Sequence, residues 1–323
     1  MSPSPRNKDG ARGKQKASQP QTPVSHPLLI TPALLRHWPL PQPFEGGDKE
    51  ERGRVLVLGG APEMPGAIIL AATAVLRAGA GKVRICAGSS IAPLLAMAVP
   101  EARVISLPET KAGGIAPRAA SKIVEHAERA QAVLIGPGMI EERAITRLMK
   151  TLLPRITRAT LILDAGALAF LHADPRVLHR FEGRAIITPH AGEMASILGT
   201  DKESITRRPA RTAQEAADGL RAVVALKGRE TFISAPTGHT YSNRAGNVGL
   251  ATSGSGDTLS GIIAGLAARG AEPLQAAVWG VYLHARAGDR LARRMGHLGF
   301  LARELLAEIP RLMSELDRRK KKR

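Results

Sequence analysis

The ten residues TSGSGDTLSG, from Thr252 to Gly261, combine glycine, hydroxyl and carboxylate groups in a pattern suited to phosphate chemistry. Gly254 and Gly256 leave the backbone free to turn its amide groups toward a ligand. The apolar run that follows predicts a helix starting at about Asp257, and a helix N-terminus carries partial positive charge. The glycines and the helix together predict an anion hole for phosphate oxygens.

Asp257 is the one carboxylate of this stretch, and the residues alone leave two interpretations of it open. Close to a transferring phosphate, Asp257 would accept the proton of an attacking hydroxyl, and the positive helix end would keep it ionised. Alternatively, Asp257 only caps the helix, with flexible glycines before it. Gly261 and Gly265, one helical turn apart, are interpreted as packing residues.

Other nucleotide-binding fingerprints do not occur in the sequence. There is no GxxxxGK[ST], and the segment RVLVLGGAPEMPGA after the first long apolar run lacks GxGxxG. Gly59 and Gly60 in that segment either admit a ligand close to the backbone or form a tight turn. The function of the glycine loop therefore depends on the elements that position it.

Short β-branched runs alternate with alanine-rich helical runs, which is typical of an α/β protein. The predicted strands cover 54–60, 82–88, 102–107, 132–138, 160–168, 184–193 and 222–228, followed by a hairpin over 231–243 and two long helices at about 257–269 and 274–294. Several strands are apolar on both faces, as in a sheet covered by helices on both sides. The sequence predicts a three-layer α/β/α sandwich around a mostly parallel sheet.

The ordered part of the chain is predicted to be one domain, because no internal repeat or linker interrupts residues 27–312. Residues 1–26 are rich in Pro, Ser, Gln and Lys without periodicity and are predicted to be a disordered basic tail. Residues 313–323 are predicted to be a second basic tail.

In an open parallel sheet, ligands bind at the carboxyl ends of the strands. Glycine, hydroxyl or charged residues follow the predicted strands at that edge, where the apolar runs stop. These residues, which we expect to come together, are Gly59–Gly60, Gly136–Gly138, Asp164, Thr188–His190 and Lys227–Gly228.

The formal net charge of +18 does not by itself indicate a nucleic-acid-binding protein. Residues 1–26 contribute +4 and residues 317–323 contribute +5, so half of the charge lies in the two tails. Aromatic residues make up 3% of the chain, which leaves few platforms for stacking bases. We expect no specific nucleic-acid partner, and at most a loose attraction of the tails to polyanions.

The single cysteine, Cys86, excludes an intramolecular disulfide and favours a reducing compartment. No run of roughly 18 apolar residues predicts a membrane span, and the N-terminal residues have no secretory h-region. The sequence therefore predicts a cytoplasmic protein without a membrane partner.

Six segments, in this order along the chain, resemble the ADP-dependent NAD(P)H-hydrate dehydratases, repair enzymes with a ribokinase-like fold. They are GGAPEMPGAIILAATAVLRAGAGKV, LIGPGM, LILDAGAL, TPHAGEMASIL, ALKGRET and NVGLATSGSGDTLSGIIAG. The resemblance covers about residues 30–312. It implies dehydration of the S-epimer of the hydrated cofactors NADHX and NADPHX, with ADP as co-substrate and Mg²⁺ as cofactor, releasing AMP and phosphate. Phosphate leaves more easily than hydroxide, so this reaction would need a phosphoryl-transfer loop.

The resemblance also implies residue roles. Asp257 would bind the hydroxyl of the hydrate and act as the base, and Gly254 and Gly256 would contact the nucleotide phosphate. The residues implied to hold the hydrate are Ala67, Gly138 and His190, those implied to line the AMP moiety are Lys227, Gly228, Arg229, Glu230 and Thr231, and those implied to act on magnesium through water are Glu193 and Asp164. Without the resemblance, His190 would be a hydrogen-bonded turn histidine and Asp164 a helix cap.

The sequence departs from the family pattern at four places. Gly166 replaces the second acid of DADAL, which weakens a metal role for that turn, and Ala191 replaces a proline beside His190. The glycine-rich segment differs at Ala61 and Met64, and the loop threonine is Ser255. The resemblance further implies a homotetramer and, because residues 1–26 are too short for an epimerase, a separate NAD(P)H-hydrate epimerase as functional partner.

Two other functions share some of these features. A small-molecule kinase of the same fold, acting on a vitamin-precursor alcohol, would have the same glycine loop but would consume ATP and leave a stable phosphorylated product. A non-catalytic binder that recruits polyanions through its basic tails would show steeply salt-dependent binding and would lose function without the tails.

Overall fold

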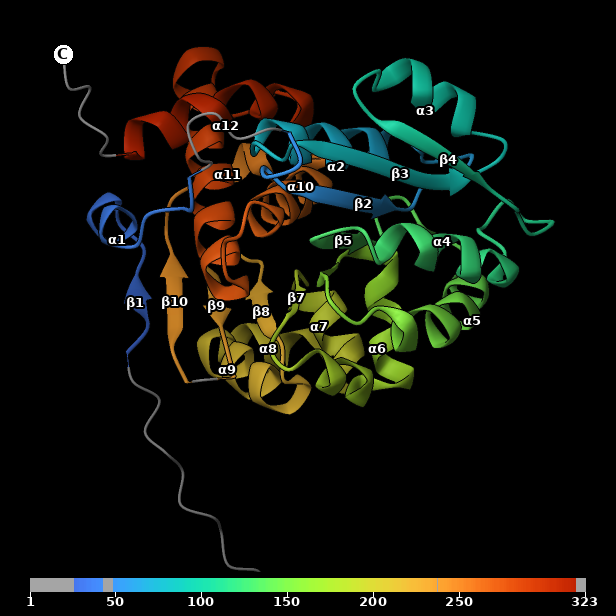
Figure 1. Ribbon diagram of the computed structural model, residues 1–323. Helices are drawn as coiled ribbons and strands as arrows, with labels where there is room; N and C mark the ends of the chain where they lie inside the picture. The colour runs from blue at the N-terminus through green and yellow to red at the C-terminus, as the bar shows by residue number, and fades with distance from the viewer. Residues whose placement is uncertain (1–25, 43–48, 237, 318–323) are drawn as a thin grey trace, which may run out of the picture.

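A ten-stranded sheet runs through the molecule in the order β1-β10-β9-β8-β7-β6-β5-β2-β3-β4 (Figure 1). The computed structural model describes residues 26–42, 49–236 and 238–317. The strands are β1 (Leu28–Leu29), β2 (Arg54–Leu58), β3 (Lys82–Gly88), β4 (Arg103–Leu107), β5 (Ala132–Ile135), β6 (Thr160–Leu163), β7 (Ala185–Ile187), β8 (Val223–Leu226), β9 (Thr231–Ser234) and β10 (Thr240–Asn243). Only β9 runs antiparallel to its neighbours within this sheet, so the predicted mostly parallel sheet is confirmed.

Helices cover both faces of the sheet, which confirms the three-layer sandwich (Figure 1). The helices on one face are α1 (Pro32–His37), α2 (Pro65–Arg77), α3 (Ala92–Ala98), α10 (Ser255–Ala268), α11 (Pro273–Met295) and α12 (Ala302–Leu316), and those on the other are α4 (Ala120–Ala127), α5 (Glu142–Leu152), α6 (Phe170–Ala173), α7 (Ala191–Leu198), α8 (Lys202–Arg207) and α9 (Pro209–Leu220). Strand β2 shows why both layers form: Val55 and Val57 pack into one core, and Leu56 and Leu58 into the other.

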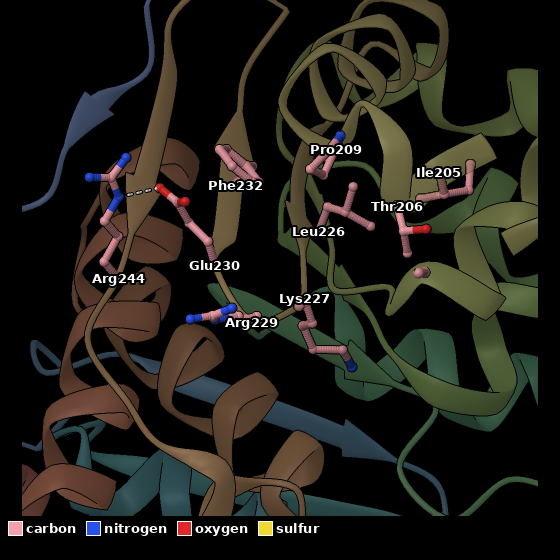
Figure 2. A pocket seen from close by; sticks show the side chains of 11 residues that line it. Ile205, Thr206, Pro209, Leu226, Lys227, Arg229, Glu230, Phe232 and Arg244 are labelled. Carbon is pink, nitrogen blue, oxygen red and sulfur yellow. Dashed lines mark hydrogen bonds and ion pairs between the residues drawn. The ribbon is translucent and has the colours of Figure 1, made fainter. Parts of the chain in front are cut away.

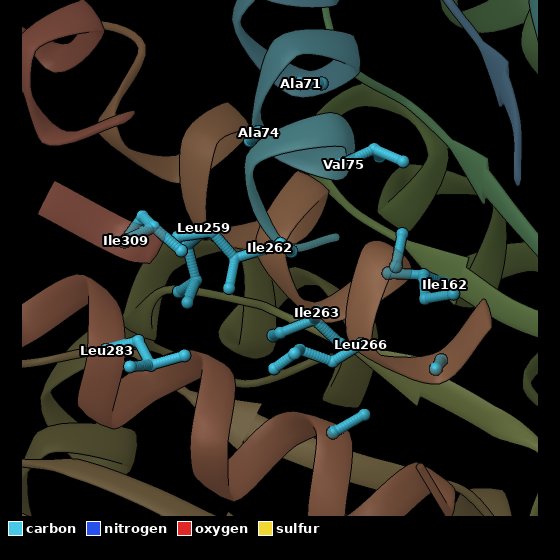
Figure 3. Packing of buried hydrophobic residues seen from close by; sticks show 14 of the residues in the cluster. Ala71, Ala74, Val75, Ile162, Leu259, Ile262, Ile263, Leu266, Leu283 and Ile309 are labelled. Atoms are coloured by element: carbon cyan, nitrogen blue, oxygen red, sulfur yellow. The ribbon is translucent and has the colours of Figure 1, made fainter. Parts of the chain in front are cut away.

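The two helices behind the glycine loop pack closely because their contact is lined by small residues. A Cβ added at Gly261 would lie 2.3 Å from the carbonyl oxygen of Ala71, and one at Gly265 would lie 2.6 Å from that of Val75. Figure 3 shows Ala71, Ala74 and Val75 on α2, next to the helix that carries Leu259 and Ile262. The prediction that Gly261 and Gly265 are packing residues is therefore confirmed, and the contact fixes where α10 begins.

Most predicted elements occur within a few residues of their expected ends, including the β9–β10 hairpin and the two long helices, observed as α10 and α11. The sequence interpretation named no element at β1, α1, α5, α6, α7, α8 or α12. Helix α12 continues through residue 312, where the domain was predicted to end, and the side chain of Leu316 is buried. The predictions for residues 1–25 and 318–323 lie outside the described residues. Within the described part of the chain, every helix is too short or too polar to span a bilayer.

Candidate active site

The carboxyl ends of five adjacent strands form a continuous edge, as the sequence predicted. The loops after β2 and β5 meet where the amide of Gly60 donates to the carbonyl of Pro137 at 2.7 Å. A Cβ at Gly136 would lie 1.7 Å from the carbonyl oxygen of Asp164, so glycine is needed for the next contact along the edge. At the far end, the amide of Lys227 donates to the carbonyl of Pro189 at 2.8 Å.

The glycine loop begins α10 two residues earlier than the sequence predicted. Gly254 is the N-cap, with φ +85°, and Asp257 lies inside the first turn of the helix. A Cβ at Gly254 would lie 2.3 Å from Cδ1 of Leu70 on α2, so both the backbone angle and the space favour glycine. The alternative that Asp257 is only the N-cap is therefore wrong, and its carboxylate is available for other contacts.

Lys227 lies between the carboxylates at the centre of the edge. Its Nζ is 3.3 Å from Oδ1 of Asp164 and 3.9 Å from Oε2 of Glu193. Burial alone would lower the pKa of Lys227, but the charges of Asp164, Glu193 and Asp257 outweigh it and raise that pKa. A Cβ at Gly256 would lie 3.5 Å from the same Nζ, so this fixed positive charge faces the glycine loop.

The pKa of Asp257 is raised to about 6, mainly by burial and further by the negative charge of Asp164, while Lys227 opposes the rise. The sequence interpretation expected the helix end to keep this carboxylate ionised, without such a rise. Burial wins because the carboxylate has lost much of its hydration. A base whose pKa lies just below the operating pH is ionised and still holds a proton well, which suits proton transfer.

We expect the activity of this site to fall as the pH drops through about 6. Protonated Asp257 cannot accept a proton, so kcat/KM should decrease about tenfold for each pH unit below the pKa of the carboxyl. The measurement is kcat/KM between pH 5 and 8 at constant ionic strength. A profile that stays flat down to pH 5 would exclude Asp257 as the titrating base.

Asp164 follows β6 and occupies the N-cap position of the short 3-10 helix Ala165–Ala169, but its side chain makes no capping hydrogen bond. The side chain is 2% exposed. Its Oδ1 accepts a hydrogen bond from Oγ1 of Thr188 at 2.7 Å and contacts Lys227. The carboxylate therefore pairs with Lys227 and does not cap the helix. The departure at Gly166 also has a steric reason, because a Cβ there would lie 2.1 Å from the carbonyl oxygen of Met139.

His190 is both a turn histidine and a group open to a ligand. It caps α7, where its Nδ1 accepts the amides of Gly192 at 3.0 Å and Glu193 at 3.1 Å. The carboxylate of Glu193 accepts the amide of His190 at 2.7 Å, which completes a capping box. Because Nδ1 accepts, Nε2 carries the proton of the neutral ring, and the side chain is 59% exposed.

Gly138 and Ala67 lie against each other at the β2–β5 end of the edge. A Cβ at Gly138 would lie 3.1 Å from that of Ala67, and its φ of +69° also favours glycine. Ala67 lies on α2 one turn before Leu70, the residue that packs against Gly254. Gly59 has the same close-approach role as Gly138, because a Cβ there would lie 2.2 Å from the carbonyl oxygen of Pro137. These small residues form the surface at the carboxyl ends of β2 and β5, beside the glycine loop.

A cavity of about 1030 Å³ opens beside the glycine loop. Five of the seven residues expected to bind the nucleotide line it, namely Lys227, Gly228, Arg229, Thr231 and Gly256. Gly254 does not line this cavity, because the position of its absent side chain faces Leu70 of α2. Glu230 lines a neighbouring cavity, where it pairs with Arg244 at 2.9 Å (Figure 2). Most of the predicted nucleotide segment therefore shares one space with the anion loop.

His284 and Asn243 are among the polar residues of this cavity that the sequence interpretation missed. Nε2 of His284 lies 2.9 Å from Oγ of Ser255, and burial lowers the pKa of His284 to about 4, so the ring is neutral. Asn243 donates from Nδ2 to the carbonyl of Ala245, while its buried Oδ1 has no partner. A histidine among small residues on the otherwise apolar face of α11 was the available signal.

We expect Gly256→Ala to weaken nucleotide binding without destabilising the fold. The added methyl group would lie at ordinary contact distance from Nζ of Lys227, in the space where a phosphate would approach the loop. Losing one hydrogen bond to a charged group would raise KM for the nucleotide about 10- to 100-fold. The control is Gly219→Ala on α9, where nothing lies within 4 Å. Equal nucleotide KM values for both variants and the wild type would contradict this placement of the phosphate.

The parallel sheet, the glycine loop at the start of α10 and the carboxylate inside that helix define a ribokinase-like α/β protein. A ribokinase-like protein from Enterococcus faecalis shows the same fold, with a TM-score of 0.77, 24% identity and coverage of 93% of this chain and 99% of that one. The family model described as NAD(P)H-hydrate dehydratase matches residues 55–311, and the chain belongs to that family.

Individual relatives agree with this assignment. The chain is 46% identical over 289 residues to the ADP-dependent (S)-NAD(P)H-hydrate dehydratase of Xanthomonas campestris, covering 90% of this chain and 97% of that protein. It is 43% identical to a bifunctional NAD(P)H-hydrate repair enzyme of Moorella thermoacetica, of which it spans 54%. The structure of the Bacillus subtilis ADP/ATP-dependent dehydratase, co-crystallised with ATP and Mg²⁺, matches with a TM-score of 0.75 at 29% identity, covering 90% of this chain and 99% of that one.

Proposed function

We propose that this protein catalyses the ADP-dependent dehydration of the S-epimer of NADHX and NADPHX, restoring NADH and NADPH and releasing AMP and phosphate. The observation that carries the proposal is the half-buried Asp257, whose pKa lies near 6, inside the first turn of a helix that opens on a nucleotide-sized cavity. Membership of the dehydratase family supports the same reaction over a kinase. A hydroxyethylthiazole kinase shares the fold at 17% identity and a TM-score of 0.57, which supports no common activity.

In this mechanism the chain acts by positioning charge and moving one proton. The amides around Gly256 and the ammonium group of Lys227 bind the terminal phosphate of ADP. Asp257 takes the proton of the hydrate's hydroxyl as that oxygen bonds to phosphorus, and the bond between phosphorus and the AMP oxygen breaks. The ring nitrogen's lone pair then expels phosphate, and the adjacent ring carbon loses its proton to the departing phosphate, which restores the double bond.

Magnesium fits this site only as a companion of the nucleotide. The carboxylates of Asp164 and Glu193 already contact Lys227, and the described residues contain no cluster of His, Cys, Asp and Glu placed to hold a metal. Mg²⁺ commonly keeps several waters and is bound largely through substrate phosphates. We therefore propose that Glu193 and Asp164 act on the ion through water at most, and that its bound role is to neutralise phosphate charge.

Partners and assembly belong to the same proposal. An NAD(P)H-hydrate epimerase as functional partner is supported by the bifunctional relative, because this chain matches about half of that protein's length. A homotetramer is expected by resemblance to the family, and the molar mass in solution tests it. The single free cysteine, Cys86, is buried and is compatible with a reducing, cytoplasmic compartment.

The decisive experiment follows the recovery of reduced cofactor. Purified protein is incubated with Mg²⁺, NADH hydrate and ADP, and the absorbance of the reduced nicotinamide is recorded. We expect recovery that depends on ADP, with one AMP and one phosphate released for each NADH. If neither ADP nor ATP supports recovery and ATP is instead consumed with a hydroxymethylpyrimidine or thiazole alcohol, the protein is a kinase and the proposal is wrong.

A further inference from the structure

A second cavity, of about 620 Å³, adjoins the nucleotide cavity, and of its lining residues only Lys227 takes part in the mechanism above. Residues of α7, α8, α9 and the β8–β9 turn line it, whereas α10 and α11 line the first cavity (Figure 2). Lys227, Gly228, Arg229 and Arg244 line both. Ligands in the two cavities would therefore share contacts with the segment from Lys227 to Arg229 and with Arg244.

The chemistry of the second cavity suits a flat ring that carries a phosphate. Its floor is apolar, formed by the buried side chains of Leu226, Phe232 and Ile205. Its rim is basic: Arg244 pairs with Glu230, while Arg229 is exposed and makes no ion pair within the part of the chain that the structure describes. An apolar floor with a few convergent charged groups is the common composition of a ligand site.

The substrate of the proposed function is a dinucleotide, so its adenosine half needs a place outside the pocket of the hydrated ring. His190, implied to hold the hydrate, lines the first cavity, and the next residue, Ala191, lines the second. A chain of phosphates passing His190 would thus reach the second cavity along the start of α7. Resting on the proposed function, we propose that the second cavity binds the adenosine half of the dinucleotide substrate.

Two other spaces near the sheet fit this role poorly. A cavity beside Gly60 and Ile145 has a volume of only about 10 Å³, which holds one water molecule and no base. A cavity of about 230 Å³ at Arg269 lies beyond the C-terminal end of α10, the end opposite to Asp257. The second cavity is large enough and lies at the reacting edge.

The test fills the cavity from an exposed position. Thr206 on α8 is exposed and lines the cavity, so Thr206→Trp should occupy it without disturbing the core. The matched control is Lys202→Trp, at an exposed position of the same helix that does not line the cavity. We expect Thr206→Trp to raise KM for the dinucleotide hydrate about tenfold or more, with KM for ADP unchanged and Lys202→Trp like the wild type.

A truncated substrate makes the test specific. The hydrate of reduced nicotinamide mononucleotide lacks the adenosine half, so Thr206→Trp should process it as the wild type does. Equilibrium binding of NADP⁺, a non-reacting probe, should weaken in Thr206→Trp by the same factor as the dinucleotide KM rises.

The outcomes separate this assignment from the proposed function. If the wild type dehydrates neither hydrate, the proposed function fails and the assignment fails with it. If the wild type dehydrates the dinucleotide hydrate and Thr206→Trp matches it in KM, the assignment alone is wrong. A change of subunit number in Thr206→Trp, with a normal KM per assembled site, would identify the cavity as a contact between copies and would also overturn the assignment.

Discussion

Replacing Asp257 by asparagine is expected to lower kcat by about 10²- to 10⁴-fold, because the amide cannot accept the proton of the hydrate's hydroxyl. Asparagine has nearly the shape of aspartate, so the glycine loop and the cavity should remain. The dissociation constant for ADP should stay close to that of the wild type. Measuring kcat under saturating substrates together with ADP affinity tests both statements, and a variant with near-normal kcat would remove Asp257 from the mechanism.

Stability provides the control that Asp257→Asn remains folded. The folded-state pKa of about 6 lies above the ordinary value of 3.8 for an aspartate, so the protonated carboxyl is favoured in the fold and the ionised form is disfavoured. The stabilising contribution is present below about pH 4 and is lost as the pH rises through 6. Asparagine cannot ionise, so the variant should be more stable than the wild type at pH 8, by at most roughly 3 kcal/mol, and similar at pH 4. A lower melting temperature at pH 8 would contradict this linkage.

Replacing Lys227 by methionine is expected to have the second largest effect. It removes the cation that contacts Asp164 at 3.3 Å and faces the glycine loop. Loss of this charge should lower kcat/KM by about 10²- to 10³-fold, as for other groups that stabilise a transferring oxyanion. The pKa of Asp257 should rise further, because Lys227 is the cation that now holds it down, and the acidic limb of the pH profile should move upward.

Three variants distinguish an effect of the charge from a general loss of folding. Lys150→Met, at an exposed position of α5, controls for removal of a lysine and should behave as the wild type. Lys227→Arg keeps the positive charge and should recover part of the ADP affinity. Lys227→Met combined with Asp164→Asn removes the buried, unpaired carboxylate and should recover stability without recovering activity. A Lys227→Met enzyme with an unshifted acidic limb would show that the two charges are not coupled.

The sequence was sufficient for the layers and for the location of the site. Strands such as RVLVL are apolar on both faces, which requires a covered, mostly parallel sheet, and such a sheet gathers its polar strand ends on one edge. The glycines at 254 and 256 mark a loop that approaches a ligand, because few other residues adopt the backbone that Gly254 has. The family was predicted from sequence motifs, and most of these motifs follow the strands whose carboxyl ends meet at this edge.

Element boundaries and charges could not be derived in the same way. Asp257 was expected to begin its helix, but α10 starts at Ser255 because Gly254 takes the capping position against Leu70 of α2, a neighbour about 180 residues away along the chain. Asp164 was interpreted as a cap or a metal group, and the sequence did not indicate its contact with Lys227, which spans 63 positions. A local sequence pattern cannot predict contacts of this kind, because they depend on which strands lie side by side in the sheet.

The sequence by itself determined the fold class and the position of the glycine loop, and it predicted Asp257 as the reacting group, since these depend on residue type and local periodicity. Only the tertiary structure decided the protonation of Asp257 and the partner of His284, since both follow from burial and from charges on other elements. It also decided that two cavities share the segment from Lys227 to Arg229. The turn after β8 carries this segment. Residues of α7, α8 and α9 line the cavity on one side of the turn, and residues of α10 and α11 line the other cavity.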